Sequence, residues 1–217
     1  MSHRRLVVAL VALLVLVLLA PAAARALDLE KGVKAGVNLS NFHGSFADLA
    51  DTQPMAGLVA GAFAAVGFAP DLAIQVEVLY TMKGAKAVSN PAEAAGSELG
   101  PSDTFVILDY LEVPVLLRGT LMRDAAVQPM GYLGPTFGFN LGGKVQTGAS
   151  GTQTQDLSNL KAVDFGLAVG AGAGFEIREH RVLTELRYTT GFTDIYDLKG
   201  NAQSINHVFS LTAGLEF

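Results

Sequence analysis

A His-Gly-Ser tripeptide at residues 43–45 has the residue types needed for nucleophilic catalysis. His43 could act as a general base toward the hydroxyl group of Ser45, and Asp48 or Asp51 could orient the histidine. Such a site needs the serine and its base within hydrogen-bond reach, with a third group orienting the base. A glycine separates the two here, and no strand pattern covers the tripeptide to hold them in place. We therefore interpret it as part of a surface loop.

Nine charged residues could carry proton or ion chemistry, because they occupy the polar positions of segments in which apolar and polar residues alternate. They are Lys34, Glu77, Lys83, Glu112, Arg118, Asp164, Glu185, Arg187 and Glu216. Glu77, Glu112 and Glu185 could include an acid and base pair, or the set could line an ion path. We favour a structural interpretation, in which four cations and five anions pair inside a closed fold, since buried charges are rare unless paired.

Eight segments of the sequence alternate with a period of two residues, which is the pattern of a half-buried β-strand. They are centred on residues 33–41, 57–68, 72–83, 106–119, 129–141, 163–176, 182–192 and 206–217. Most have about ten residues or more, enough for a tilted strand to cross a membrane. A soluble β-sandwich is the alternative, because its strands alternate in the same way.

The connections between these segments differ in length in a regular order. Short connections fall at residues 69–71, 122–126 and 178–181, and long polar ones at residues 42–56, 84–105, 142–162 and 193–205. Short periplasmic turns and long extracellular loops alternate in this way in outer-membrane barrels. The pattern predicts an all-β fold, an eight-stranded antiparallel up-and-down transmembrane β-barrel.

The end of the sequence favours the membrane barrel over the sandwich. Its apolar positions include Phe209, Leu211, Leu215 and the final Phe217. This pattern resembles the C-terminal strand by which outer-membrane barrels are recognised for assembly. Aromatic residues expected at the two rims also fit the aromatic girdles of such barrels; they are Phe68, Phe175, Phe217, Tyr80 and Phe165.

Two local features carry their own predictions. Pro114 lies in the middle of an expected strand, and because proline cannot donate a ladder hydrogen bond we expect a β-bulge there. The glycines of residues 170–174 are not followed by the helix or the lysine of a phosphate loop. We interpret them as room for side chains inside the barrel.

The first residues of the chain have the composition of a signal peptide. A basic start at residues 3–5 precedes an apolar run that Pro21 ends, and a small-residue motif, Ala24-Arg25-Ala26, follows. A retained membrane anchor would need about 20 apolar residues. The expected organisation is a signal peptide at residues 1–26 and an outer-membrane β-barrel domain at residues 27–217.

Composition excludes several classes of function. Cleavage removes three of the 15 Lys and Arg residues, which leaves 12 against 20 Asp and Glu residues and a net charge of −8. That balance argues against nucleic acid as a partner. The chain has no cysteine for disulfides, thiol catalysis or metal ligation. The three histidines after residue 26 are too widely spaced to predict a metal site, and we expect no cofactor.

Several short segments resemble recurring pieces of the PorT-like outer-membrane β-barrel family. They are residues 32–38 (GVKAGVN), 77–84 (EVLYTMKG) and 110–114 (YLEVP), followed by Gly134-Pro135, Arg187-Tyr188 and the final Phe217. The resemblance spans residues 27–217 and implies an integral protein of a bacterial outer membrane. Architecture is better defined in this family than activity.

We expect a non-enzymatic protein with a structural or surface-interaction role through its extracellular loops. The expected partners are outer-membrane lipid and, during biogenesis, the barrel-assembly machinery; the sequence does not identify a surface ligand. The alternatives are an outer-membrane lipid-modifying enzyme of the lipid A acyl hydrolase type and a barrel for small-solute permeation.

Cleavage after Ala26 is the first testable prediction, because small residues frame that position and the following Leu27-Asp28 ends the apolar character. The intact mass of the protein extracted from membranes should correspond to residues 27–217. A mass that includes residues 1–26 would contradict it.

Overall fold

Strands make up almost all of the part of the chain that the structure describes. The structure is a computed structural model and describes residues 29–43, 52–87, 104–147, 153–157, 160–193 and 205–217. The strands are β1 (Leu29–His43), β2 (Thr52–Ala69), β3 (Leu72–Ala87), β4 (Thr104–Thr120), β5 (Val127–Thr147), β6 (Gln153–Asp156), β7 (Val163–Ile177), β8 (His180–Gly191) and β9 (Ile205–Glu216). Among these residues, no helix is long and apolar enough to cross a membrane.

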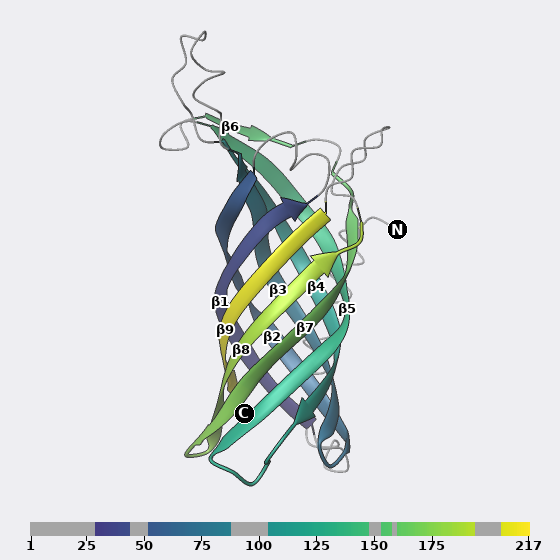
Figure 1. Cartoon of the computed structure of the whole chain (residues 1–217), viewed down its shortest axis with the longest axis vertical. Helices are drawn as coiled ribbons and strands as arrows, with labels where there is room; N and C mark the ends of the chain where they lie inside the picture. The colour runs from purple at the N-terminus through teal and green to yellow at the C-terminus, as the bar shows by residue number, and fades with distance from the viewer. Residues whose placement is uncertain (1–28, 44–51, 88–103, 148–152, 158–159, 194–204) are drawn as a thin grey trace.

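Eight of the strands form a closed antiparallel barrel. Each pairs with its neighbours in the order β1-β2-β3-β4-β5-β7-β8-β9, and β9 pairs with β1 from Gly32↔Glu216 to His43↔Ile205, which closes the ring. The short β6 pairs with the end of β5, beyond the ring (Figure 1). The predicted eight-stranded barrel is confirmed. We call the end with the β2–β3, β4–β5 and β7–β8 connections the turn end, and the opposite end the loop end.

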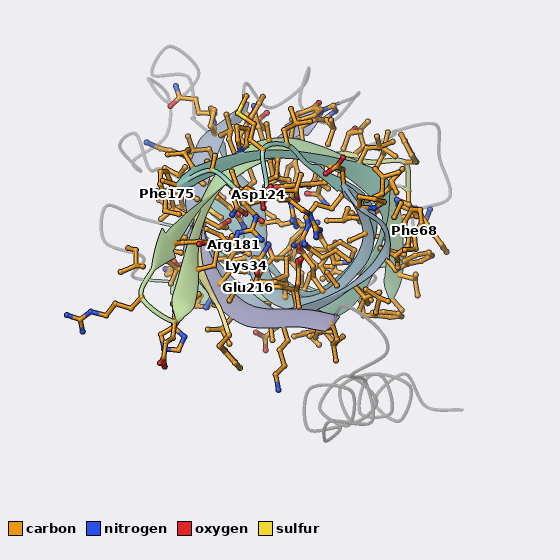
Figure 2. The ribbon with its side chains drawn as sticks, turned by 90° about the horizontal axis from the view of Figure 1, so that it is seen from below. Lys34, Phe68, Asp124, Phe175, Arg181 and Glu216 are labelled. Atoms are coloured by element: carbon orange, nitrogen blue, oxygen red, sulfur yellow. The ribbon has the colours of Figure 1, made fainter. Side chains whose placement is uncertain are left out.

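The outward face of the barrel is apolar and exposed. Leu58 and Leu186 each expose 59% of their surface, and Val37 on β1 exposes 50%. Seen from the turn end, Phe68 and Phe175 lie outside the ring of strands, whereas Lys34, Arg181 and Glu216 lie inside it (Figure 2). A soluble β-sandwich would bury its apolar face. A continuous exposed apolar surface instead suits contact with lipid.

Several strands run further toward the loop end than the sequence predicts. β3 and β5 continue to residues 87 and 147, and β6 lies within the segment expected to be the third long loop. The prediction of loops over the whole of residues 84–105 and 142–162 is therefore wrong. The cause is a hydrophobic core inside this part of the barrel, formed by Phe42, Ala85, Val106, Leu108 and Tyr110 with Val145, Leu157 and Leu160 packed against it.

A glycine makes the close packing of this core possible. A Cβ atom on Gly143 would lie only 2.7 Å from side-chain carbons of both Leu108 and Leu160. Leu108 is completely buried. The inward face of the barrel is thus apolar at the loop end and rich in charge farther down. This change of polarity along the axis is absent from the predicted pattern.

The bulge expected at Pro114 is not present. Pairing between β3 and β4 keeps one register on both sides of the proline, from Val76↔Val115 to Leu79↔Glu112. Ladder pairs are missing next to the proline, but no extra residue is inserted there. The missing N–H group of the proline therefore does not by itself shift the register of β3 against β4. The register shift of β4 against β5 lies instead between Asp109 and Tyr110.

The glycine-rich part of β7 provides room for inward side chains, as predicted. A Cβ atom on Gly170 would lie 2.5 Å from the Tyr132 ring, and one on Gly174 would lie 2.3 Å from Nε of Arg181. Both side chains therefore lie directly against the backbone of β7.

The orientation of the barrel can be tested with single cysteines, because the natural sequence has none. Asp156 on β6 and Glu179 in the β7–β8 turn are both exposed, at opposite ends. A membrane-impermeant maleimide should label the Asp156→Cys variant on intact cells, and the Glu179→Cys variant only after the outer membrane is permeabilised. Labelling of the Glu179→Cys variant alone on intact cells would show that the barrel has the opposite orientation.

Candidate functional site

The nine charged residues predicted to face inward all lie on the inward side of the strands. Eight of them are buried, and Glu216 is half-buried near the turn end. They form three clusters along the barrel axis. We call these the middle cluster (Lys34, Glu77, Glu185, Arg187), the loop-end cluster (Lys83, Glu112, Asp164) and the turn-end cluster (Arg118 and Glu216, with Glu30, Arg123 and Arg181).

The middle cluster joins three walls of the barrel by crossed ion pairs. Nζ of Lys34 on β1 lies 2.9 Å from Oε1 of Glu77 on β3 and 2.6 Å from Oε2 of Glu185 on β8. Arg187 on β8 donates two hydrogen bonds to the Glu77 carboxylate, at 2.7 and 2.8 Å. Such a bidentate pair fixes direction as well as distance. Two cations and two anions balance one another here.

Neutral side chains add hydrogen bonds to this cluster, although Oε1 of Glu185 has no donor. Gln75 donates to Glu77 at 2.6 Å, and Thr212 on β9 donates to Glu185 at 3.3 Å. Arg187 lies over the Tyr132 ring at 5.0 Å and donates to its hydroxyl at 3.3 Å. The glutamates thus have additional hydrogen bonds, which offset part of the cost of removing their charge from water.

The loop-end cluster contains one tight ion pair and one further acid. Nζ of Lys83 on β3 lies 2.5 Å from Oε2 of Glu112 on β4, and it lies over the Tyr110 ring at 5.1 Å. Asp164 on β7 accepts a hydrogen bond of 3.5 Å from the side-chain amide of Asn206 on β9. The cluster lies directly below the hydrophobic core, with Tyr110 common to both.

The turn-end cluster is organised around Arg118, whose side chain is fully buried. It forms an ion pair with Glu30, lies 3.7 Å from Glu216 and donates to Gln75 at 2.9 Å. Arg181 lies 3.1 Å from the other Glu216 oxygen. Gln75 contacts both Arg118 and Glu77, so the turn-end and middle clusters are joined by hydrogen bonds.

The structure separates some residues that the sequence grouped together. Glu77 and Glu185 share Lys34 and Arg187, but Glu112 belongs to the loop-end cluster with Lys83. The three glutamates considered as an acid and base pair therefore do not meet at one point. Each of them is also engaged by a cation, which is the arrangement of a structural ion-pair network.

Sequence reasoning missed two inward charges, Glu30 and Arg181. Both were excluded because the strands were expected to begin a few residues later. Glu30 has the same parity along β1 as Lys34, and Arg181 has the same parity along β8 as Glu185. Extending the alternation toward the turn end would have found both residues.

The clusters leave little open space in the middle of the barrel. A void between the middle and loop-end clusters, bordered by Lys83, Glu112 and Arg187, has a volume of about 10 Å³. That is about the space of one water molecule. A wider hollow of about 490 Å³ opens at the turn end, lined by residues such as Glu30, Arg181 and Glu216.

The other candidate residues do not form a site in the described part of the chain. His180 is exposed in the β7–β8 turn, and His207 contacts the Tyr188 hydroxyl. Across the ranges that the structure describes, no three His, Cys, Asp or Glu side chains are placed to hold a metal ion. The His43 side chain lies outside the described residues, as do Ser45, Asp48 and Asp51, so the His-Gly-Ser hypothesis stays untested.

The residues of the expected assembly signal face outward on the last strand. Phe209, Leu211 and Phe217 each expose 55% of their surface, and Leu215 exposes 38%. The Phe217 N–H group donates to the backbone carbonyl of Lys31 at 2.9 Å, which extends the closing ladder to the final residue. The last strand thus presents an apolar face toward the membrane.

Comparison with known proteins gives one family match and several structural likenesses. The model of a family described as "Outer membrane protein beta-barrel domain" matches residues 21–197. No curated protein matches the chain.

Three solved structures illustrate the likeness. The attachment invasion locus protein Ail of Yersinia pestis is 14% identical, with a TM-score of 0.41 over 87% of this chain and 99% of Ail. Neisserial surface protein A is 16% identical, with a TM-score of 0.44 over 86% and 95%. OprG from Pseudomonas aeruginosa is also 16% identical, with a TM-score of 0.44 over 87% and 95%.

The middle cluster predicts a large cost for removing one of its carboxylates. In the Glu77→Gln variant, Lys34 and Arg187 keep only Glu185 as a counter-charge, so the free energy of unfolding should fall by roughly 3 to 5 kcal/mol. Urea-induced unfolding of the protein in detergent micelles measures this free energy. The control, Glu179→Gln in the exposed turn, should change the free energy by less than about 0.5 kcal/mol. Equal stability of the two variants would show that the cluster contributes no net stabilisation.

Proposed function

Because the chain belongs to the outer membrane protein beta-barrel domain family and is thus an integral protein of a bacterial outer membrane, we propose that it is non-enzymatic and presents its loop end outside the cell. Within that family we propose membership of the PorT-like group, on the segments at residues 32–38, 77–84 and 110–114. The proposed role is structural or one of surface interaction.

The observation that supports this proposal most strongly is the hydrophobic core at the loop end. A barrel that only had to cross the membrane could end at the upper edge of its apolar band. Here β3, β4 and β5 continue, and buried side chains such as Phe42 and Leu108 hold them together. Side chains packed in this way preorganise a surface for binding better than a mobile loop does.

The outward residues near the loop end mark the expected boundary with the outer-membrane lipid. The Tyr80 hydroxyl donates to the Asp109 carboxylate at 2.6 Å on the outside of the barrel. A carboxylate facing lipid costs little near the interface and more at the centre of the bilayer. On β8 and β9, Tyr188 and His207 also pair with each other. These polar contacts suit the headgroup level, with the apolar band below them.

Biogenesis supplies the second proposed partner, the barrel-assembly machinery. The outward apolar residues Phe209, Leu211, Leu215 and Phe217 lie on the strand that closes the sheet. We propose that they form the recognition signal for that machinery. If removal of Phe217 left the amount of protein in the outer-membrane fraction unchanged, this role would be contradicted.

The crossed ion pairs argue against solute permeation. An eight-stranded barrel is only wide enough for its own side chains, and here charges from β1, β3 and β8 meet in the middle of it. These contacts support the proposal that no wide path runs along the described part of the lumen. A role in transport would require these pairs to separate.

Two measurements on one preparation test the proposed function. The purified protein should give no steady conductance in planar bilayers, because the clusters fill the lumen. Expression of the protein should leave the masses of the outer-membrane lipids unchanged. A stable single-channel current would favour permeation, and a lipid that loses an acyl chain only when the protein is present would favour the lipid-modifying enzyme.

A further inference from the structure

The loop-end cluster has one more negative charge than positive charges. Lys83 is engaged by Glu112 at 2.5 Å, and within the part of the chain described no ion pair joins Asp164 to a cation. Asp164 is 92% buried, with 8% of its surface exposed. Its polar contacts are the Asn206 amide at 3.5 Å and a backbone hydrogen bond from Thr193. The middle cluster, by contrast, is balanced.

Two oxygen atoms in this place have no hydrogen-bond donor. Oδ1 of Asp164 and Oδ1 of Asn206 are both buried and unpartnered, although the two side chains touch through their other polar atoms. Asn206 is almost completely buried, with 1% of its surface exposed. Lys83 attracts the Asp164 carboxylate as well as that of Glu112, so one cation faces two anions. A water molecule could satisfy the oxygens, but it would leave this surplus negative charge in a poorly solvated interior, which is costly.

Backbone without side chains surrounds the carboxylate of Asp164. A Cβ atom on Gly191 of β8 would lie 3.3 and 3.4 Å from the two carboxylate oxygens, and one on Gly138 of β5 would lie 3.3 Å from Cβ of Asp164. Asp164 thus lies between glycines of the two neighbouring strands. The carboxylate oxygens therefore lie close to the Gly191 backbone, in the space that a side chain at this position would occupy.

We propose that the loop-end cluster binds one small, hard monovalent cation through the Asp164 carboxylate and the Asn206 amide oxygen. Hard cations prefer ligands of this kind, carboxylate and amide oxygens. The single surplus charge matches a monovalent ion. A divalent ion would need a second free carboxylate, and Glu112 is already paired with Lys83.

The test measures thermal unfolding of the full mature chain in detergent during titration with NaCl or KCl. N-methylglucamine chloride, whose cation is too large for the site, keeps the ionic strength constant. The unfolding midpoint should rise saturably, by about 5 °C or more once the site is filled. The Asp164→Asn variant should lose this response. The control variant Asp109→Asn, which removes an outward carboxylate near the same end, should keep it.

If Asp164→Asn does not fold, a second variant tests the same site. Asn206→Asp adds a carboxylate to the site, so the concentration of cation that gives half of the response should fall at least tenfold. If the salts raised the unfolding midpoint of the unaltered protein and of Asp164→Asn equally, a cation site at Asp164 would be contradicted. A response to Ca²⁺ or Mg²⁺ alone would overturn the monovalent assignment. Stabilisation by acid but by no cation would mean that a proton neutralises Asp164, and would overturn the proposal.

Discussion

Complete pairing of the backbone is the constraint on which the rest of this structure depends. In hydrocarbon an unpaired N–H or C=O group costs several kcal/mol, so a membrane sheet must have no open edge. The chain meets this requirement where β9 pairs with β1 along its length and where Phe217 donates to Lys31. Closure with eight strands then sets a narrow interior, in which inward side chains from opposite walls touch.

The narrow interior explains why charge inside the barrel is compatible with stability. Lys34, Glu77 and Arg187 come from three different strands. Because the ring brings these strands together, Lys34 and Arg187 each lie within 3 Å of the Glu77 carboxylate. Above them the interior becomes apolar around Leu108, where water instead of lipid surrounds the outside in the proposed orientation. The barrel therefore combines a charged interior in the membrane with a core like that of a soluble protein beyond it.

Period-two alternation made the strands, the outward band and the inward position of nine charges predictable from the sequence. It could not predict which charges pair, because parity identifies the face of a strand and not its height in the barrel; Lys34 and Glu185, 151 residues apart, are an example. Alternation is weak at residues 105–111, where apolar side chains such as Ile107 and Leu108 lie on opposite faces of the strand. There Asp109 faces outward and Leu108 inward, contrary to the simple pattern.

We propose that the crossed ion pairs of the middle cluster exclude water from the middle of the lumen. The exchange of the Arg187 guanidinium protons with solvent, measured by NMR on the protein in lipid nanodiscs, tests this claim most directly. Because Glu77 and Tyr132 accept hydrogen bonds from this side chain and its surroundings are buried, the account predicts exchange far slower than that of a free arginine. Exchange as fast as that of free arginine would show that water reaches the middle of the barrel and would contradict the account.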